Sequence, residues 1–227
     1  MSIAVRDICK RVRLCYDEEA RNIAELSEQT TDSTLMDNII KDKIGDGLRW
    51  ICLYAPSEQL AGGGSSGDAV NIIVDATGSV PTDGRIPLGS SFIRLIRVRC
   101  SNWHRAVMGD SLLKEDSNEY LQLYDTYGAE ATTDRPQAAL IESSEKKVEV
   151  WPHSSSDYEL TKLVMPSAAD LDNLGPDTLI GVPPLLESSF IYYLAFLTLS
   201  AYEDSRSARM LEIARMNLGI TEDKQRQ

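Results

Sequence analysis

The hydrophobic residues near the start of the chain recur at the spacing of an amphipathic helix, with Ser2 as a candidate N-cap. They predict a helix over residues 3 to about 18, whose apolar face consists of Val5, Ile8, Val12 and Cys15. Farther along, Asp32 or Ser33 can cap a second, longer helix. Its predicted buried face comprises Leu35, Ile39, Ile40, Ile44, Leu48, Ile51 and Tyr54.

The middle of the chain alternates between apolar and polar positions, which is the pattern of half-buried strands. The run "AVNIIVDA" at 69–76 predicts a strand, and the Asp83-Gly84 step in "VPTDGRIP" predicts the turn after it. Apolar residues at 92–96 have the spacing of one helical turn. Residues 96–101 then predict a strand whose arginines stay in water.

Two further alternating runs flank a polar loop in "EKKVEVWPHSSSDYELTKLVM". Val148 and Val150 mark the first run, and alternating apolar positions over 158–164 mark the second. The loop "PHSSS" is too long for a tight two-residue turn. We therefore predict an antiparallel hairpin that carries an exposed Trp151-Pro152 step.

The longest hydrophobic element begins at Pro183-Pro184 and predicts a helix from 185 to about 203 at the centre of the core. Residues 204–218 either extend this helix or turn back as a further one. Helices at both ends and strands between them do not alternate as βαβ units do. The predicted fold class is α+β, a helical bundle from the N- and C-terminal helices with a central antiparallel β insertion.

The length of 227 residues allows a substantial core, and we expect residues 1–227 to form one domain. The segment "GGGSSGD" at 62–68 has the composition of a linker. The predicted parts are a helical part at 1–61 and 184–218, a β-rich part at 68–168 and a polar tail at 219–227.

Charge is distributed unevenly along the chain, which has a formal net charge of −12. This acidic balance argues against a protein that grips nucleic acid, because such binding depends on clustered cations. Residues 85–109 contain five arginines and no acidic residue, whereas residues 163–204 contain acidic residues and no Lys or Arg. Either copies of the chain pair basic face to acidic face, or both surfaces are solvated and never meet.

The side chains that could support chemistry form no recognisable motif. The four cysteines contain no C-x-x-C pair, so we interpret them as small buried hydrophobic residues in a reducing compartment. The glycine-rich segment lacks the Lys-Ser/Thr step of a P-loop, and "GSSF" is not a nucleophile elbow. His104 and His153 are interpreted as structural or solvated. We predict no catalytic, cofactor or metal site.

The sequence contains no recognisable signal peptide and no apolar run long enough to span a membrane. The first twenty residues lack the uninterrupted apolar run of a signal peptide. The most apolar segment, at 190–201, is shorter than the roughly 20 residues needed to span a bilayer. We expect a core helix there and no membrane partner.

Five segments cover most of residues 35–218 in the order "DGLRWICLY", "IPLGSSFIRLIRV", "SNEYLQLYD", "PQAALIESSEKKVEVWPHSSSDYELTKLVMPSA" and "IGVPPLLESSFIYYLAFLTLSAYEDSRSARMLEIARMNL". In this order they resemble the head-to-tail connector (portal adaptor or ring) proteins of tailed phages, of the short-tailed or crAss-like type. The glycine-rich 62–68 segment and the extended "AEATTDRPQ" region depart from the family pattern.

The resemblance implies a structural role without catalytic residues: a ring of about twelve copies beneath the portal, joining capsid to tail and lining the DNA channel. The expected partners are further copies, the portal protein and the next tail ring protein, in a virion assembled in the host cytoplasm. DNA would pass through without sequence-specific binding. The family's C-terminal segment commonly docks against the portal, here near 205–227.

The residues selected as candidate interface positions are Arg94, Arg97, Arg99, Trp151, His153, Arg206, Arg209 and Arg215. The loop at 153–156 would contact the next copy or the next ring. Other functions stay open at this point: another neck or tail ring, a tail-completion protein, a phage-encoded hydrolase that uses His104 or His153, or a bacterial regulatory binding module.

Overall fold

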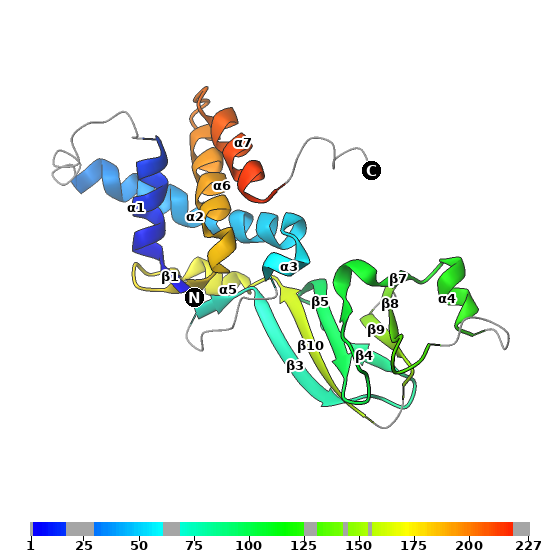
Figure 1. Cartoon of the computed structure of the whole chain (residues 1–227). Helices are drawn as coiled ribbons and strands as arrows, with labels where there is room; N and C mark the ends of the chain where they lie inside the picture. Colours follow the sequence, from blue (N-terminus) through cyan, green and yellow to red (C-terminus); the bar gives the residue numbers. More distant parts are fainter. Residues whose placement is uncertain are drawn as a thin grey trace. The chain divides into compact units, whose positions relative to one another are not determined.

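The computed structural model describes residues 2–16, 30–60, 69–124, 131–142, 145–153 and 156–219. The predicted linker at 62–68 and nearly all of the predicted tail lie outside these ranges. The chain divides into two compact units (Figure 1). The helical unit combines residues 1–72 with 166–227, and the β unit is the continuous segment Ile73–Met165.

The helical unit is organised around α6, which spans Glu187–Ser200 after a short 3-10 turn at Pro184–Leu186. Helix α6 packs against α1 (Val5–Tyr16), α2 (Thr30–Tyr54) and α7 (Ser207–Asn217) (Figure 1). Two short helices, α3 (Ser57–Leu60) and α5 (Ala168–Asp172), complete the unit's helices as described. The prediction of a core helix is confirmed, because Phe190, Leu194 and Ala195 are fully buried. Residues 204–218 turn back as α7.

The helical unit also contains a three-stranded sheet of order β1-β11-β2. Its strands are β1 (Ser2–Ala4), β11 (Leu179–Gly181) and β2 (Ala69–Asn71), and β11 pairs antiparallel with β1 but parallel with β2. Ser2 is therefore a strand residue, and its predicted N-cap role is wrong. The first-turn amides of α1 are satisfied by backbone instead: Val5 and Arg6 donate to the carbonyls of Thr178 and Pro176.

The β unit contains two four-stranded sheets. The first has the order β3-β10-β5-β6: Ile73–Ser79, Asp157–Val164, Phe92–Cys100 and Val107–Met108. The second has the order β4-β9-β8-β7: Arg85–Pro87, Lys146–Trp151, Gln137–Glu142 and Leu113–Lys114. A 3-10 turn at Gly109–Ser111 lies between β6 and β7, and helix α4 at Asn118–Gln122 lies between β7 and β8. Both sheets contribute to one core that includes Ile86, Val150, Leu95 and Trp103.

The predicted helical bundle with a single central antiparallel insertion is wrong, although the class α+β holds in its broad sense. The described residues form three sheets, two of which are mixed, and one of the mixed sheets belongs to the helical unit. Its strands are three residues long, too short to leave an alternating signal. The run at 69–76 contains two strands, β2 and β3, which belong to different units.

The predicted hairpin is also wrong, because β9 and β10 do not pair with each other. Strand β9 lies between β4 and β8, whereas β10 lies between β3 and β5. The chain between Trp151 and Asp157 therefore passes from one sheet to the other. Alternation shows which side chains are buried and not which strand is the partner. Trp151 is only 8% exposed, so the expected exposed Trp-Pro step is not found.

The helical turn expected at 92–96 is a strand, because β5 is continuous from Phe92 to Cys100. Opposite it, Thr161 pairs with Arg97 and Lys162 with Leu95, so the register shifts around Ile96. This bulge places Leu95 and Ile96 in succession in buried positions. Two consecutive buried residues imitate helical spacing, which explains the wrong prediction.

Candidate docking groove

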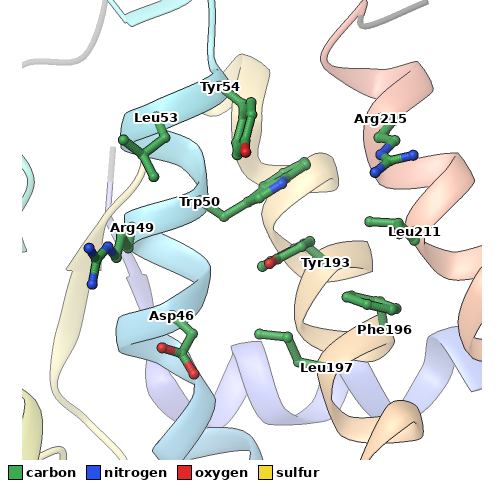
Figure 2. Close-up of a pocket in the computed structure, with 10 residues that line it drawn as sticks. All are labelled: Asp46, Arg49, Trp50, Leu53, Tyr54, Tyr193, Phe196, Leu197, Leu211 and Arg215. Carbon is green, nitrogen blue, oxygen red and sulfur yellow. The ribbon is translucent and has the colours of Figure 1, made fainter. Parts of the chain in front are cut away.

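A groove of about 500 Å³ opens on the helical unit between the end of α2 and helices α6 and α7 (Figure 2). The lining residues are Asp46, Arg49, Trp50, Leu53, Tyr54, Tyr193, Phe196, Leu197, Leu211 and Arg215. Sequence reasoning assigned Tyr54 to the buried face of α2, but its side chain is 55% exposed. Helix α2 thus extends past the core it covers, and its last turn forms one wall of the groove.

Aromatic side chains form the floor of this groove. The Trp50 and Tyr193 rings stack at a centroid distance of 4.2 Å and an interplanar angle of 5°. Tyr54 lies 6.1 Å from Trp50, and Phe196 lies 5.5 Å from Tyr193, both tilted. The four rings come from two helices and make a continuous apolar surface with limited rotational freedom.

Charged residues of both signs border the aromatic floor. Arg215 on α7 faces the aromatic side chains, whereas Arg49 points outward from α2 (Figure 2). Within the described ranges, neither arginine forms an ion pair with an acidic residue. Burial raises the pKa of Tyr193, with a further increase from the Asp46 charge and an opposing effect of Arg215. The groove therefore combines an apolar floor with a cation available to a partner.

The β unit contains a second cluster, centred on the buried carboxylate of Glu149, which is 3% exposed. Tyr120 and Tyr124 donate hydroxyl hydrogen bonds to it at 3.1 and 2.5 Å, and Arg85 Nε lies 3.4 Å away. Both tyrosine rings meet Trp151 edge to face, at 5.7 and 5.8 Å. This network joins α4 and the residues after it to strand β9.

The ionisation behaviour of the cluster follows from burial and from its carboxylate. Burial, the hydrogen bond with Tyr124 and the Glu149 charge raise the pKa of Tyr120. The pKa of Tyr124 is raised chiefly by burial and by its bond to Glu149. Tyr124 and Glu149 raise the pKa of Arg85. The tyrosines stay neutral donors, so the cluster fixes the position of α4.

The structure places five candidate interface residues in the β unit and does not gather them at one site. Arg94, Arg97 and Arg99 lie along β5, where Arg97 Nε donates to Thr161 Oγ1 at 3.2 Å. Trp151 is in the buried aromatic cluster. His153 is exposed, and its ring lies beside the backbone of Gly84.

The other three candidates lie at α7. Arg206 forms a two-pronged ion pair with Asp204, with distances of 3.2 and 2.7 Å to Oδ2. Arg209 is exposed on the helix surface. Arg215 lines the groove, which makes it the one of the three that lies with the aromatic residues. Trp50 and Tyr193 were not selected from the sequence. The i, i+4 pair Trp50 and Tyr54 was the available signal.

Part of the acidic 163–204 segment is paired within its own chain. Asp177 binds Arg6 at 2.8 Å, and Glu187 pairs with Arg11. Both arginines lie on α1, so this helix neutralises two of the segment's carboxylates within the helical unit. Across the described ranges, no three His, Cys, Asp or Glu side chains are grouped to hold a metal ion.

No protein-family model matches this chain, and a search of curated proteins finds no similar sequence. Among the helices described, none combines the length and apolar character required to cross a bilayer.

Proposed function

We propose that the chain is a structural subunit of the neck of a tailed phage. In this proposal about twelve copies form a ring beneath the portal, which joins capsid to tail and surrounds the DNA channel. The order of its sequence motifs, which resembles that of head-to-tail connector proteins, supports the proposal. The observation that carries it is the aromatic groove of the helical unit.

The groove has the composition of a protein-binding surface. Trp, Tyr and Arg are the residues most enriched among those that dominate binding energy, and the floor and rim here provide Trp50, Tyr193 and Arg215. The stacked rings are held in place before any partner arrives, which lowers the entropic cost of association. The side chains of Leu53 and Tyr54 are exposed in the free chain and would be buried against a bound partner.

The charge balance suits a wall around moving DNA. The net charge of −12 gives the surface little general affinity for phosphate, so a polyanion can pass without being retained. The partners in this proposal are the portal on one side and the next tail ring on the other. The segment near 205–227 would meet the portal. The protein would assemble in the host cytoplasm and remain in the virion.

Purified chain mixed with portal protein from the same phage tests the proposal by negative-stain microscopy. We expect rings of uniform diameter stacked on the portal. The same mixture with the next tail ring protein, in place of the portal, separates the connector from a second candidate, another neck ring or a tail-completion protein. A chain that associates with neither protein and forms no ring contradicts both functions.

A further inference from the structure

We infer that the groove of one copy receives helix α4 of a neighbouring copy. The inference rests on the proposed ring and identifies the contact between its subunits. One partner surface is the groove between α2, α6 and α7, and the other is the segment 115–124 of the β unit.

The α4 segment presents apolar side chains to solvent. Leu121 is 57% exposed, and Tyr124 exposes about half of its side chain. Leu121 lies on α4 and Tyr124 lies two residues after its end, so both exposed side chains belong to one short segment. The groove floor, which is built from Trp50, Tyr193 and Phe196, offers these side chains an apolar surface.

The charges of the two surfaces are complementary. Segment 115–124 carries Glu115, Asp116 and Glu119, all exposed, and contains no Lys or Arg. The groove presents Arg215 toward its aromatic floor. An apolar side chain of α4 on that floor would bring neighbouring carboxylates to the arginine. Such an arrangement favours one partner and one orientation.

The β unit holds α4 ready for binding. Ser117 caps the helix by accepting the Tyr120 amide at 3.2 Å. The Tyr120 and Tyr124 hydroxyls donate hydrogen bonds to the buried Glu149 carboxylate on β9. These bonds hold the segment against the β unit while Leu121 stays exposed to solvent. Little conformational entropy remains to be lost when the helix docks.

The contact joins two different surfaces, so it is heterologous. A heterologous contact repeats from copy to copy and gives a closed ring when the rotation closes. An isologous contact, groove to groove, would stop at a dimer. The predicted pairing is therefore of the kind that a ring requires.

Cysteine cross-linking tests the pairing directly. In a Cys15→Ser background, one preparation carries Leu53→Cys in the groove and another carries Leu121→Cys on α4. With a short bis-maleimide, we expect covalent dimers from the mixture, almost none from either preparation alone, and a ladder of oligomers from the double variant. Leu185→Cys, at a leucine that is more exposed than either test position and lies outside both surfaces, is the control.

A charge exchange tests the electrostatic part by sedimentation velocity of the full chain. Arg215→Glu and Glu119→Arg should each weaken self-association about ten-fold or more. An equimolar mixture of the two single variants should recover oligomers, because alternating subunits then have opposite charges at every contact, in the wild-type order at one and in reversed order at the next. Arg209→Glu, on the same helix but outside the groove, should leave association unchanged.

The possible outcomes separate the inference from the proposed function. Dimers from the Leu53→Cys preparation alone would show a groove-to-groove contact and overturn the inference. Equal cross-linking with Leu185→Cys, or Arg215→Glu rings as abundant as wild type, would do the same while the connector function stands. If Arg215→Glu abolishes binding to portal but leaves the ring intact, the groove's occupant is the portal. A wild-type chain that neither forms rings nor binds portal would instead remove the proposed function.

Discussion

The carboxylate of Glu149 offers the sharpest test of the β unit's architecture. It is almost fully buried, and its oxygens accept hydroxyl bonds from Tyr120 and Tyr124. Glu149→Ala removes the acceptor and leaves the buried Tyr120 hydroxyl without this partner. Hydrogen bonds to a charged group contribute about 1.5–3 kcal/mol each, and an orphaned buried donor adds to the loss.

The magnitude follows from the exposure of each partner. Tyr124 and Arg85 are partly exposed, so water replaces some of what they lose. The expected fall in the free energy of unfolding for Glu149→Ala is therefore about 3–5 kcal/mol, near that for breaking a buried pair. Glu149→Gln keeps the shape and one acceptor oxygen, so its cost should be about 1–2 kcal/mol.

Urea denaturation followed by tryptophan fluorescence measures this loss, because Trp151 contacts both tyrosines and reports on the cluster. The matched control is Glu159→Ala, an exposed carboxylate on β10 in the same unit, which should change stability by less than about 0.5 kcal/mol. If Glu149→Ala and Glu159→Ala lower stability equally, the reasoning about the buried cluster is refuted.

Three further predictions concern pH, helix packing and thiol reactivity. The pKa of Tyr120 is raised above its ordinary 10.0, so the folded state holds this proton more tightly. The contribution of the Tyr120 hydroxyl to the free energy of unfolding is complete below about pH 10 and is lost as the pH rises through the pKa of the folded state. Urea titrations at alkaline pH should therefore show a smaller loss of stability for Tyr120→Phe than for the wild type. A Cβ at Gly47 would lie 2.8 Å from Phe190, whereas one at Gly45 would meet only the Leu171 side chain at 3.0 Å. Thermal melts should show Gly47→Ala losing about 1–3 kcal/mol and Gly45→Ala unchanged or slightly more stable; equal behaviour would contradict the close α2–α6 packing. Burial raises the pKa of Cys9 and Cys100 to about 11, so iodoacetamide at neutral pH should label the partly exposed Cys15 first, as mass spectrometry of peptides would show.

The sequence predicts the long helices well, because their patterns are sustained over many residues. Helix α6 is apolar on nearly every side, and α2 repeats its apolar positions over most of its length, so both were found. The three-residue strands of the helical unit were missed, since a pairing partner distant in sequence defines them. Strand partners were missed for a similar reason: burial in one shared core gives β9 and β10 the same alternation whether or not they pair.

The candidate site was only partly predictable. Arg215 was selected from the sequence, whereas Trp50 and Tyr193 were not, because each looks like an ordinary core residue in its own helix. The stacking of the two rings depends on the packing of α2 against α6, which lies outside the reach of a local pattern. The prediction that Trp151 is exposed was wrong for a related reason, because Tyr120 and Tyr124, from another part of the chain, pack against its ring and bury it.

Immuno-electron microscopy tests the proposed neck function most directly, with an antibody raised against this chain and applied to purified particles of a tailed phage whose genome carries this sequence. A structural subunit of the neck should be labelled at the junction of capsid and tail in nearly every particle. Particles that are infectious, complete and free of label would contradict the account.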